Sequence, residues 1–419
     1  FIHHGSISKE FRKDAEEKLK DPSRKTTTVS TVTLELGIDV GDLDRVIQIG
    51  APFTCSGLVQ RMGRSGRRGN EQTMVIMCNE DEDHWWTSIE EIPMDLIKAI
   101  AMTELVLKEN WTEPADIDSL PYGLLYHQTM EYLRSGLGAK FSILVSDVLT
   151  LYPFRNISKE QYKLLIKHLV NIEHLQVMSD NTILIGPKAE KMVFNRDFCS
   201  VFTTKKEIIV KYEGKVVGSI QDLPQVDDLI QLAGRVWSVV EVSNDRNSVE
   251  VVEVEGEAAN PWRSGTPPTH TRIMEKMLEV LESDETYPYL NESATFALDN
   301  SRSIARATGM TSKFSQRKGG YRMYPWIGTK QFDTLVRILK KVIGTEKVRS
   351  FQPYYIDIRT NLSEDEILNR IDGYIKRTNG YSLVEDDDLL RYGKYDRFIP
   401  ESLLTREFAE NRLNFDFRL

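Results

Sequence analysis

Residues 60–69 read Gln-Arg-Met-Gly-Arg-Ser-Gly-Arg-Arg-Gly and carry the strongest functional signal in the chain. Arginines at this density are too costly to bury in a core, and the glycines between them let the backbone turn closely around a bound group. Arginine suits phosphate because its planar guanidinium donates hydrogen bonds in pairs and never loses its charge. Arg64 and Arg67 lie three positions apart, so a helical turn would place both guanidiniums on one side. The stretch predicts a phosphate-binding site, and a basic surface helix is the alternative.

A second stretch lies upstream and reads Thr-Val-Thr-Leu-Glu-Leu-Gly-Ile-Asp over residues 31–39. Thr31 directly follows a predicted strand, while Gly37 and Asp39 come at fixed offsets behind it. Such a segment can face a phosphate through its hydroxyl at one end and a ribose through its carboxylate at the other. Because both stretches fall in the same α/β unit, together they form a specific pattern.

Strand-like and helix-like segments alternate over residues 1 to about 97. The predicted strands are 26–30, 45–49 and 73–78, and the predicted helices are 8–19 and 56–63. This alternation indicates a parallel α/β sheet. The chain starts with Phe1 rather than Met, in what reads as the end of a strand, so we expect an N-terminal truncation.

Three further regions follow, in keeping with three or four domains in 419 residues. Residues 98–195 are predicted to be a winged-helix region, because a capping box at 158–161 starts a helix that a turn and a short strand follow. Residues 196–262 contain closely spaced β segments, which favour a small β-barrel or a sandwich. Residues 263–419 read as a helical C-terminal domain, in which 385–388 is an acidic surface loop. The expected fold class is mixed α and β: an α/β RecA-like lobe followed by winged-helix, small β-barrel and helical domains.

The composition is that of an ordinary globular protein, with 40% hydrophobic and 28% charged residues. No stretch approaches the roughly 20 apolar residues that span a bilayer, so we expect a cytoplasmic protein without a membrane partner. The cysteines are widely spaced without a CxxC pattern and the histidines do not cluster, so we predict neither a disulfide scaffold nor a metal site. The net charge of -9, taken alone, argues against nucleic-acid binding. Such binding depends on a locally basic groove, however, and not on the total charge.

The two phosphate-facing stretches together resemble motifs V and VI of superfamily 2 helicases. Residues 34–41 and 60–67 are closer still to the large helicase-related (Lhr) family, and residues 3–8 resemble the preceding motif of its second RecA-like lobe. Residues 232–237 and 260–262 resemble its β-barrel region. The resemblance covers most of the chain, strongly to residue 80 and more loosely beyond it.

The resemblance implies a role in an ATP site for most of the predicted residues. Arg67 would be the arginine finger with Arg64 beside it on the γ-phosphate, Gly37, Gln60 and Asp39 would line the nucleotide cleft with Asp39 on the ribose, and Thr31 would contact the nucleic-acid backbone. No G-x-x-x-x-G-K-[ST] loop and no DEAD- or DEAH-like motif occurs in the sequence. ATP and Mg²⁺ would therefore be held mainly by a first RecA-like lobe that this chain lacks, and we expect the chain alone not to turn over ATP.

A second basic region spans residues 300–332, where aromatic residues are interleaved with basic ones. It contains no acidic residue, and its basic residues are Arg302, Arg306, Lys313, Arg317, Lys318, Arg322 and Lys330. Basic side chains with aromatics can track a single strand and stack its bases, so we predict that Arg317, Lys318 and Arg322 bind nucleic acid. A basic surface over an aromatic core is the alternative.

The expected function is that of part of an ATP-dependent helicase or translocase that acts on single-stranded DNA and unwinds DNA or RNA–DNA duplexes. In this interpretation the chain supplies the arginine-finger lobe and accessory DNA-binding domains, and its partners are nucleic acid and the first lobe. The resemblance also suggests 3′-to-5′ travel and a role in DNA repair. Two alternatives stay open: an RNA helicase with the same motor, since no residue identifiably reads a 2′-hydroxyl, and a non-catalytic module that binds a protein partner.

Overall fold

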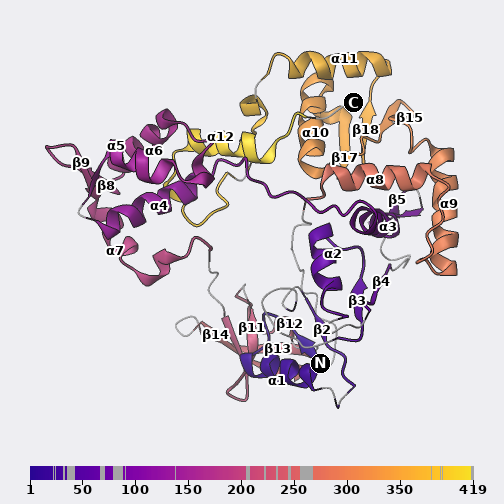
Figure 1. The fold of residues 1–419 in the computed structure, drawn as a ribbon, viewed down its shortest axis with the longest axis horizontal. Helices are drawn as coiled ribbons and strands as arrows, with labels where there is room; N and C mark the ends of the chain where they lie inside the picture. Colours follow the sequence, from indigo (N-terminus) through magenta and orange to yellow (C-terminus); the bar gives the residue numbers. More distant parts are fainter. Residues whose placement is uncertain are drawn as a thin grey trace. The chain divides into compact units, whose positions relative to one another are not determined.

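The computed structural model describes the whole chain except residues 22, 24, 32–33, 35–42, 67–70, 79–87, 90, 137, 204–207, 221–222, 233–234, 244–246, 255–267, 379, 387, 389 and 417–419. The chain forms two compact units, whose elements are labelled in Figure 1. Unit one contains Phe1–Glu113, Thr204–Pro267 and Pro288–Leu298, and unit two contains Pro114–Thr203, Pro268–Tyr287 and Asp299–Leu419. Each unit is therefore assembled from separate stretches of the chain.

Unit one begins with an α/β arrangement. Its elements are β1 (Ile2–His3), α1 (Lys9–Lys20), β2 (Val29–Ser30), β3 (Val46–Ile49), α2 (Cys55–Met62), β4 (Met74–Met77), β5 (Ser88–Ile89), β6 (Ile92–Pro93) and α3 (Met94–Leu107). β1 pairs in parallel with β2, and β3 pairs in parallel with β4. The strands and helices predicted for this part are confirmed, and so is the parallel α/β organisation.

The helix α3 forms an apolar centre in unit one. Its side chains at Ile97, Ile100, Met102 and Leu105 are at most 2% exposed. A helix that is apolar on all sides is typical of a core position. The helix continues through residue 97, where the sequence predicted a domain boundary. Neither α3 nor any other described helix combines the length and the apolarity that crossing a bilayer requires.

The β-rich part of unit one is an open sheet. Its strands are β10 (Ile208–Tyr212), β11 (Lys215–Ile220), β12 (Leu229–Leu232), β13 (Arg235–Ser243) and β14 (Ser248–Val254), in the order β11-β10-β14-β13-β12. The predicted small β-barrel is not closed. Its two edge strands are β11 and β12, and no pairing among the described residues joins them.

Residues 6–8 cover the outer edge of β11 instead. The Ser6 carbonyl accepts a hydrogen bond from the Ser219 N–H at 2.6 Å, and the Ser8 N–H donates to the Val217 carbonyl at 3.4 Å. Gly218 permits this approach, because a Cβ atom there would lie 2.2 Å from the Ser6 carbonyl oxygen. The edge strand thus obtains backbone partners without closure of the sheet into a barrel.

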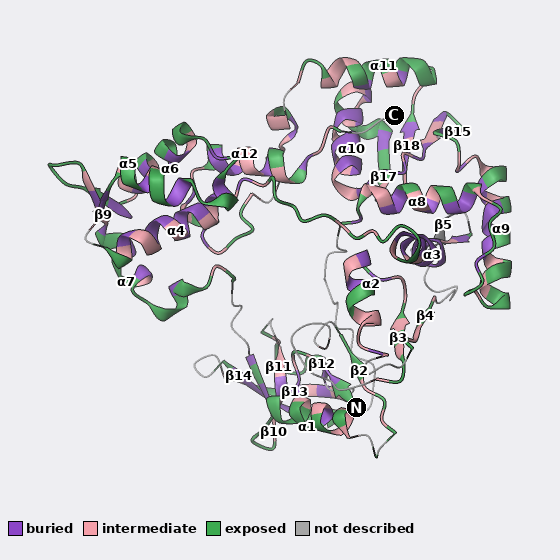
Figure 2. Ribbon diagram, in the orientation of Figure 1, coloured by how far each residue is buried: buried purple, intermediate pink, exposed green. Residues whose placement is uncertain are grey.

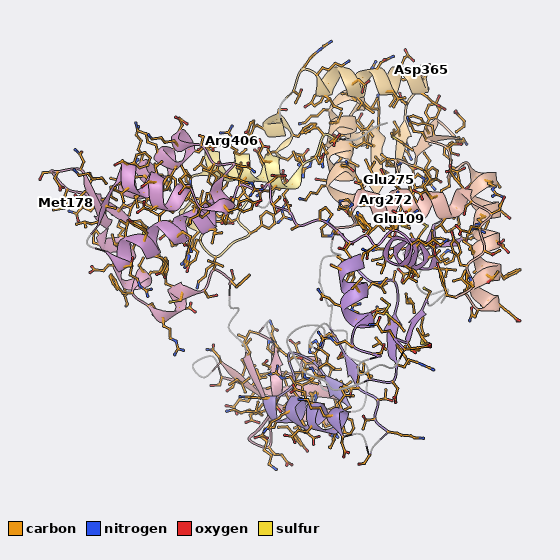
Figure 3. All side chains as sticks on the ribbon, in the orientation of Figure 1. Glu109, Met178, Arg272, Glu275, Asp365 and Arg406 are labelled. Atoms are coloured by element: carbon orange, nitrogen blue, oxygen red, sulfur yellow. The ribbon has the colours of Figure 1, made fainter. Side chains whose placement is uncertain are left out.

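The first part of unit two combines helices with a small sheet. Its elements are α4 (Tyr122–Ser135), β7 (Ala139–Lys140), α5 (Phe141–Leu144), η4 (Val145–Leu149), η5 (Tyr152–Phe154), α6 (Lys159–Asn171), β8 (Leu175–Val177), β9 (Thr182–Ile185), α7 (Pro187–Val193) and η6 (Arg196–Cys199). The strands pair in the order β7-β9-β8. The predicted capping box is present, since the Gln161 N–H donates to Ser158 Oγ at 3.2 Å and the Ser158 N–H donates to Gln161 Oε1 at 2.6 Å. Met178, labelled in Figure 3, lies at the exposed end of the β8–β9 hairpin.

The chain after residue 268 is mixed rather than helical. Its elements are α8 (Thr271–Glu282), α9 (Glu292–Thr308), β15 (Phe314–Arg317), β16 (Gly320–Met323), α10 (Thr329–Ile343), η7 (Thr345–Lys347), β17 (Val348–Phe351), β18 (Tyr355–Arg359), α11 (Glu364–Ile375), η8 (Gly380–Leu383), η9 (Asp396–Phe398) and α12 (Glu401–Arg412). The strands form an antiparallel sheet in the order β15-β16-β18-β17. The prediction of a helical C-terminal domain agrees with the five α-helices that the structure describes but leaves out this sheet, because strands this short offer too few inward positions to show a period of two.

The helices α10 and α11 cover one face of this sheet. Figure 2 shows buried residues along α10 and on the strands beside it. Phe332, Leu335 and Leu339 of α10 and Ile367 of α11 are at most 1% exposed and share a core with the strand residue Ile356.

The helix α12 contributes to two cores within unit two. Leu403 and Leu404 join the cluster that includes side chains of α4 and α6, and so do Tyr395 and Ile399 just before the helix. Phe408, further along the same helix, joins the core of the four-stranded sheet. The C-terminal stretch therefore completes the core of a region that lies much earlier in the sequence.

Candidate nucleotide and nucleic-acid site

The arginine-rich stretch begins on α2, directly behind β3. Gly50 ends β3 with a φ of 71°, which is a left-handed conformation that favours glycine. Its N–H donates to the Met77 carbonyl at 2.9 Å. Thr54 then caps α2, because its Oγ1 accepts a hydrogen bond from the Gly57 N–H at 3.0 Å. This order places the start of α2 at the carboxyl end of a parallel strand, where α/β sheets commonly bind ligands.

One carboxylate holds the backbone at the start of α2, and a second holds the segment that leads into it. Glu113 accepts hydrogen bonds from the N–H groups of Cys55 at 2.7 Å and Ser56 at 3.1 Å. Asp95, at the start of α3, accepts one from the Ala51 N–H at 3.3 Å. Negative charge is favourable at a helix N-terminus, because unpaired N–H groups and the helix dipole both point there. These contacts fix α2 to α3 and to the segment behind α3.

Lys98 accompanies these acidic groups and is 8% exposed. Burial lowers the pKa of Lys98, while Asp95, Cys55 and Glu113 act in the opposite direction. Burial also raises the pKa of the Cys55 thiol to about 12, and Glu113 adds to that effect. The thiol therefore stays protonated, and the cluster is an anchor for α2 rather than a nucleophilic centre.

The side chains of the arginine-rich stretch differ in their surroundings. Gln60 is exposed near the end of α2. Arg61 donates a hydrogen bond to the side chain of Gln48 on β3. Arg64 is half-buried in the turn after the helix. Arg61 thus ties the helix to its own sheet.

Ser65 fixes the turn that carries Arg64. The serine is fully buried, and its Oγ accepts a hydrogen bond from the Thr73 N–H at 3.0 Å. Gly66 follows with a φ of 72°, and a Cβ atom there would lie 2.5 Å from the Gln72 nitrogen. Sequence reasoning missed Ser65 and Glu113 as positioning residues. The available signal for Ser65 was a small residue between arginines and glycines, whereas nothing local pointed to Glu113.

Three predicted ATP-site residues lie outside the described residues: Gly37, Asp39 and Arg67. Their roles in the cleft, at the ribose and as the finger stay predictions. Thr31 is exposed directly after β2. Of the predicted ATP-site residues, the structure describes Gln60, which lies on α2, and Arg64, which lies in the turn after α2. Within the described stretches, no three His, Cys, Asp or Glu side chains gather as a metal site would require.

The second basic region is divided by its internal contacts, beginning with α9. Arg302 is 4% exposed and donates to the carbonyls of Val280 at 3.0 Å and Glu285 at 2.8 Å. Arg306 forms an ion pair with Asp284 at 2.6 Å. These two arginines support the local fold.

Arg322 and Lys330 also meet carboxylates. The Nε and Nη2 atoms of Arg322 donate to the two carboxylate oxygens of Asp357 at 2.7 and 2.9 Å. The Lys330 ammonium lies 2.7 Å from a carboxylate oxygen of Asp116. Arg322 was predicted to bind nucleic acid, and the structure gives its guanidinium a partner within the chain.

Arg317 and Lys318 lie together at the turn between β15 and β16, where Lys318 is exposed. The aromatic side chains of Tyr324 and Trp326 are 2% and 6% exposed. For these two aromatics the structure supports the alternative of a core position. The predicted nucleic-acid residues therefore fall on one short hairpin rather than across the whole basic region.

Comparison with known proteins shows which proteins this chain resembles. Residues 1–69 match the family described as the helicase conserved C-terminal domain. The chain thus carries the conserved C-terminal domain of a helicase.

Several of the similar proteins are Lhr-type helicases. An ATP-dependent helicase Lhr-Core from Methanothermobacter thermautotrophicus is 27% identical over 252 residues, which cover 56% of this chain and 27% of that protein. The Lhr helicase/probable uracil glycosylase of Mycolicibacterium smegmatis is 26% identical over 290 residues, which cover 62% of this chain and 18% of that protein. The solved structure of Mycobacterium smegmatis helicase Lhr bound to ssDNA and AMP-PNP aligns with a TM-score of 0.54 and 19% identity, over 91% of this chain and 49% of that chain. The chain is thus similar to Lhr-type helicases, and it spans about a quarter or less of the length of these two curated relatives.

Proposed function

We propose that this chain is the part of an ATP-driven translocase that supplies the arginine finger and a path for single-stranded DNA. The observation that carries the proposal is the backbone-held helix α2. Glu113 fixes the start of this helix, Asp95 fixes the segment before it, and Arg64 follows in the turn at its end. A rigid support suits phosphoryl transfer, because that reaction is catalysed mainly by charges positioned in advance around the γ-phosphate.

Each residue of the two motifs has a role in this proposal. Arg67 is the arginine finger, and Arg64 lies beside it on the γ-phosphate of ATP. Asp39 holds the ribose, while Gly37 and Gln60 line the nucleotide cleft. Mg²⁺ and the remaining phosphate contacts belong to the first RecA-like lobe. Closing of the cleft onto the two arginines moves one lobe along the strand.

The relatives and the fold of unit two support a DNA path. The Methanothermobacter thermautotrophicus protein is named as ATP-dependent, and the aligned Mycobacterium smegmatis structure holds ssDNA and AMP-PNP. The order α4-β7-α5-α6-β8-β9 runs helix, strand, helix, helix, strand, strand, which supports the prediction of a winged helix. In this proposal Thr31 contacts the nucleic-acid backbone, and the winged helix acts as an accessory domain.

The proposal is tested by ATP hydrolysis in a protein that joins this chain to a first RecA-like lobe. We expect magnesium- and DNA-dependent turnover that falls by roughly 10³–10⁵ in the Arg67→Ala variant. Arg235→Ala, which removes an exposed arginine paired with Glu253, is the matched control and should leave turnover unchanged. The chain alone should release no phosphate. DNA-dependent phosphate release by the chain alone, lost in Arg67→Ala, would contradict the proposal.

The RNA-helicase alternative needs a separate measurement. Affinities for RNA and DNA of one sequence are compared on the same preparation. Equal or tighter binding of DNA supports the proposal, whereas binding restricted to RNA supports the alternative.

A further inference from the structure

The four-stranded sheet of unit two, part of which is labelled in Figure 1, has the strand order β15-β16-β18-β17, and its two faces carry different side chains. Successive residues of a strand point to opposite faces. On β18, Ile356 and Ile358 belong to the core that α10 and α11 share with the sheet. Tyr355, Asp357 and Arg359 therefore lie on the opposite face.

The side chains on this second face are basic and aromatic. The strand register assigns to it six residues that we call the basic-aromatic face: Arg317, Arg322, Arg349, Phe351, Tyr355 and Arg359. Asp357 lies between Arg322 and Arg349 in the register, and it pairs with Arg322. Arg349 and Arg359 are exposed and form no ion pair with any residue that the structure describes. The face therefore keeps a positive charge after its internal pair is counted.

The two aromatic rings of this face stack on each other. The Phe351 and Tyr355 rings are parallel within 11°, with their centroids 5.4 Å apart. The Arg322 guanidinium lies 3.9 Å from the Tyr355 ring centroid, and its ion pair with Asp357 keeps it there. Arg322 thus positions Tyr355 instead of offering its charge to a ligand. Phe351 is half-buried, and its ring also lies near that of Tyr354, with the centroids 6.4 Å apart and the planes 27° apart.

We propose that the basic-aromatic face binds single-stranded nucleic acid, with Arg349 and Arg359 on phosphates and Phe351 stacked on a base. The inference rests on the proposed function and names where in unit two the strand is held. Exposed guanidiniums attract the backbone of any sequence, and an aromatic ring stacks only on a base that is not already paired and stacked in a duplex. An acidic protein segment would use the same charges but would gain nothing from the stack of rings. The face therefore fits an unpaired strand better than it fits a protein.

The charge contribution is tested by fluorescence anisotropy of a labelled oligo-dT with the full chain at several salt concentrations. We expect Arg349→Gln with Arg359→Gln to weaken binding. We also expect the slope of log affinity against log salt to flatten by about 1.4, because each phosphate on a single strand contributes about 0.7. The matched control is Lys341→Gln with Arg377→Gln, which removes two exposed cations from α10 and from the turn after α11, and its slope should equal that of the wild type. An unchanged slope in the first variant overturns the proposal.

The stacking contribution is tested separately with Phe351→Ala. We expect affinity for oligo-dT to fall roughly five- to hundred-fold without a change in the salt slope. Circular dichroism and the unfolding midpoint check that the variants are folded. The proposal is overturned if the wild type does not bind oligo-dT at low salt, or if Phe351→Ala binds oligo-dT as tightly as the wild type. It is also overturned if Phe351→Ala loses as much affinity for poly-glutamate as for oligo-dT. Each of these leaves the ATP-turnover test of the proposed function unaffected, so the two proposals fail independently.

Discussion

The arginine-rich stretch that begins on α2 and the stretch from α9 to β16 both contain several cations, but carboxylates meet them in different ways. Around α2, Glu113 and Asp95 accept hydrogen bonds from backbone N–H groups. In the second region, Asp284 and Asp357 accept hydrogen bonds from arginine side chains. The first arrangement fixes a backbone, whereas the second neutralises charge. A high density of basic residues therefore does not by itself indicate a site for anions, and the following predictions test the distinction.

The largest effect is expected where a carboxylate neutralises an arginine most completely. Asp388 accepts hydrogen bonds from two nitrogens of Arg337 at 2.7 and 2.8 Å, and the two side chains are 11% and 12% exposed. Asp388→Asn leaves Arg337 with less compensation, so we expect the free energy of unfolding in urea at pH 7 to fall by about 3–4 kcal/mol. Asp386→Asn in the same loop is the control.

The same pair predicts a pH dependence with a definite sign. Burial raises the pKa of Asp388, but hydrogen bonds from Arg337 and from the Glu385 N–H outweigh it and lower the pKa below its ordinary 3.8. The pair therefore stabilises the fold fully above pH 3.8 and loses this contribution as the pH falls further. The difference between wild type and Asp388→Asn should shrink in that acidic range. A difference that stays constant down to pH 2 would show that the carboxylate charge is not what stabilises the pair.

The next effect concerns Arg302, whose guanidinium is buried on backbone carbonyls. Arg302→Met leaves the carbonyls of Val280 and Glu285 without their donor, and we expect a loss of about 2–3 kcal/mol in the free energy of unfolding. Affinity of the folded variant for single-stranded DNA should not change. Reduced DNA affinity with unchanged stability would place Arg302 with the binding residues and break the comparison.

A smaller effect is expected at the anchor of α2. Glu113→Gln removes the negative charge from the helix N-terminus and one of its two acceptors, so we expect a loss of about 1–2 kcal/mol. Hydrogen exchange of the Cys55 and Ser56 amides should become faster than in the wild type. Glu71→Gln, at an exposed position of unit one, serves as the matched control. Unchanged exchange at both amides would show that Glu113 does not hold the helix.

The smallest effect is expected at Arg306. Its partner Asp284 is exposed, and ion pairs of this kind contribute little because water and salt screen them. Arg306→Ala should therefore leave the urea midpoint unchanged within error. A clear loss of stability would mean that the exposed and the buried arginines of α9 act alike, which would remove the contrast with Arg302.

Local patterns account for what the sequence predicted well. The predicted ends of α2, and of β3 and β4 on either side of it, each lie within one residue of the observed ends. Caps and short apolar runs act over a few positions, so the local sequence contains the signal. The capping box at Ser158 was visible for the same reason. These signals lie within the element that they define.

Partners distant in the sequence account for what was missed. Glu113 reaches α2 from 58 positions away from Cys55, and Asp388 reaches Arg337 from 51 positions away. Residues 385–388 were predicted to be a solvated acidic loop, which is wrong for Asp388. The four-stranded sheet was missed for a related reason, because its short strands become recognisable only once they are paired. No window of neighbouring residues contains these contacts.

The division of α12 between two cores has a consequence for folding during synthesis. The core around α4 and α6 lacks Tyr395, Ile399, Leu403 and Leu404 until the ribosome has added more than 200 further residues after α6. Contacts of such long sequence separation form slowly, because a large loop must close before any contact offsets its entropy. The apolar side chains of α4 therefore stay incompletely covered on the nascent chain, where exposed apolar surface favours aggregation. A chaperone that protects the region around α4 would act in the interval before α12 emerges.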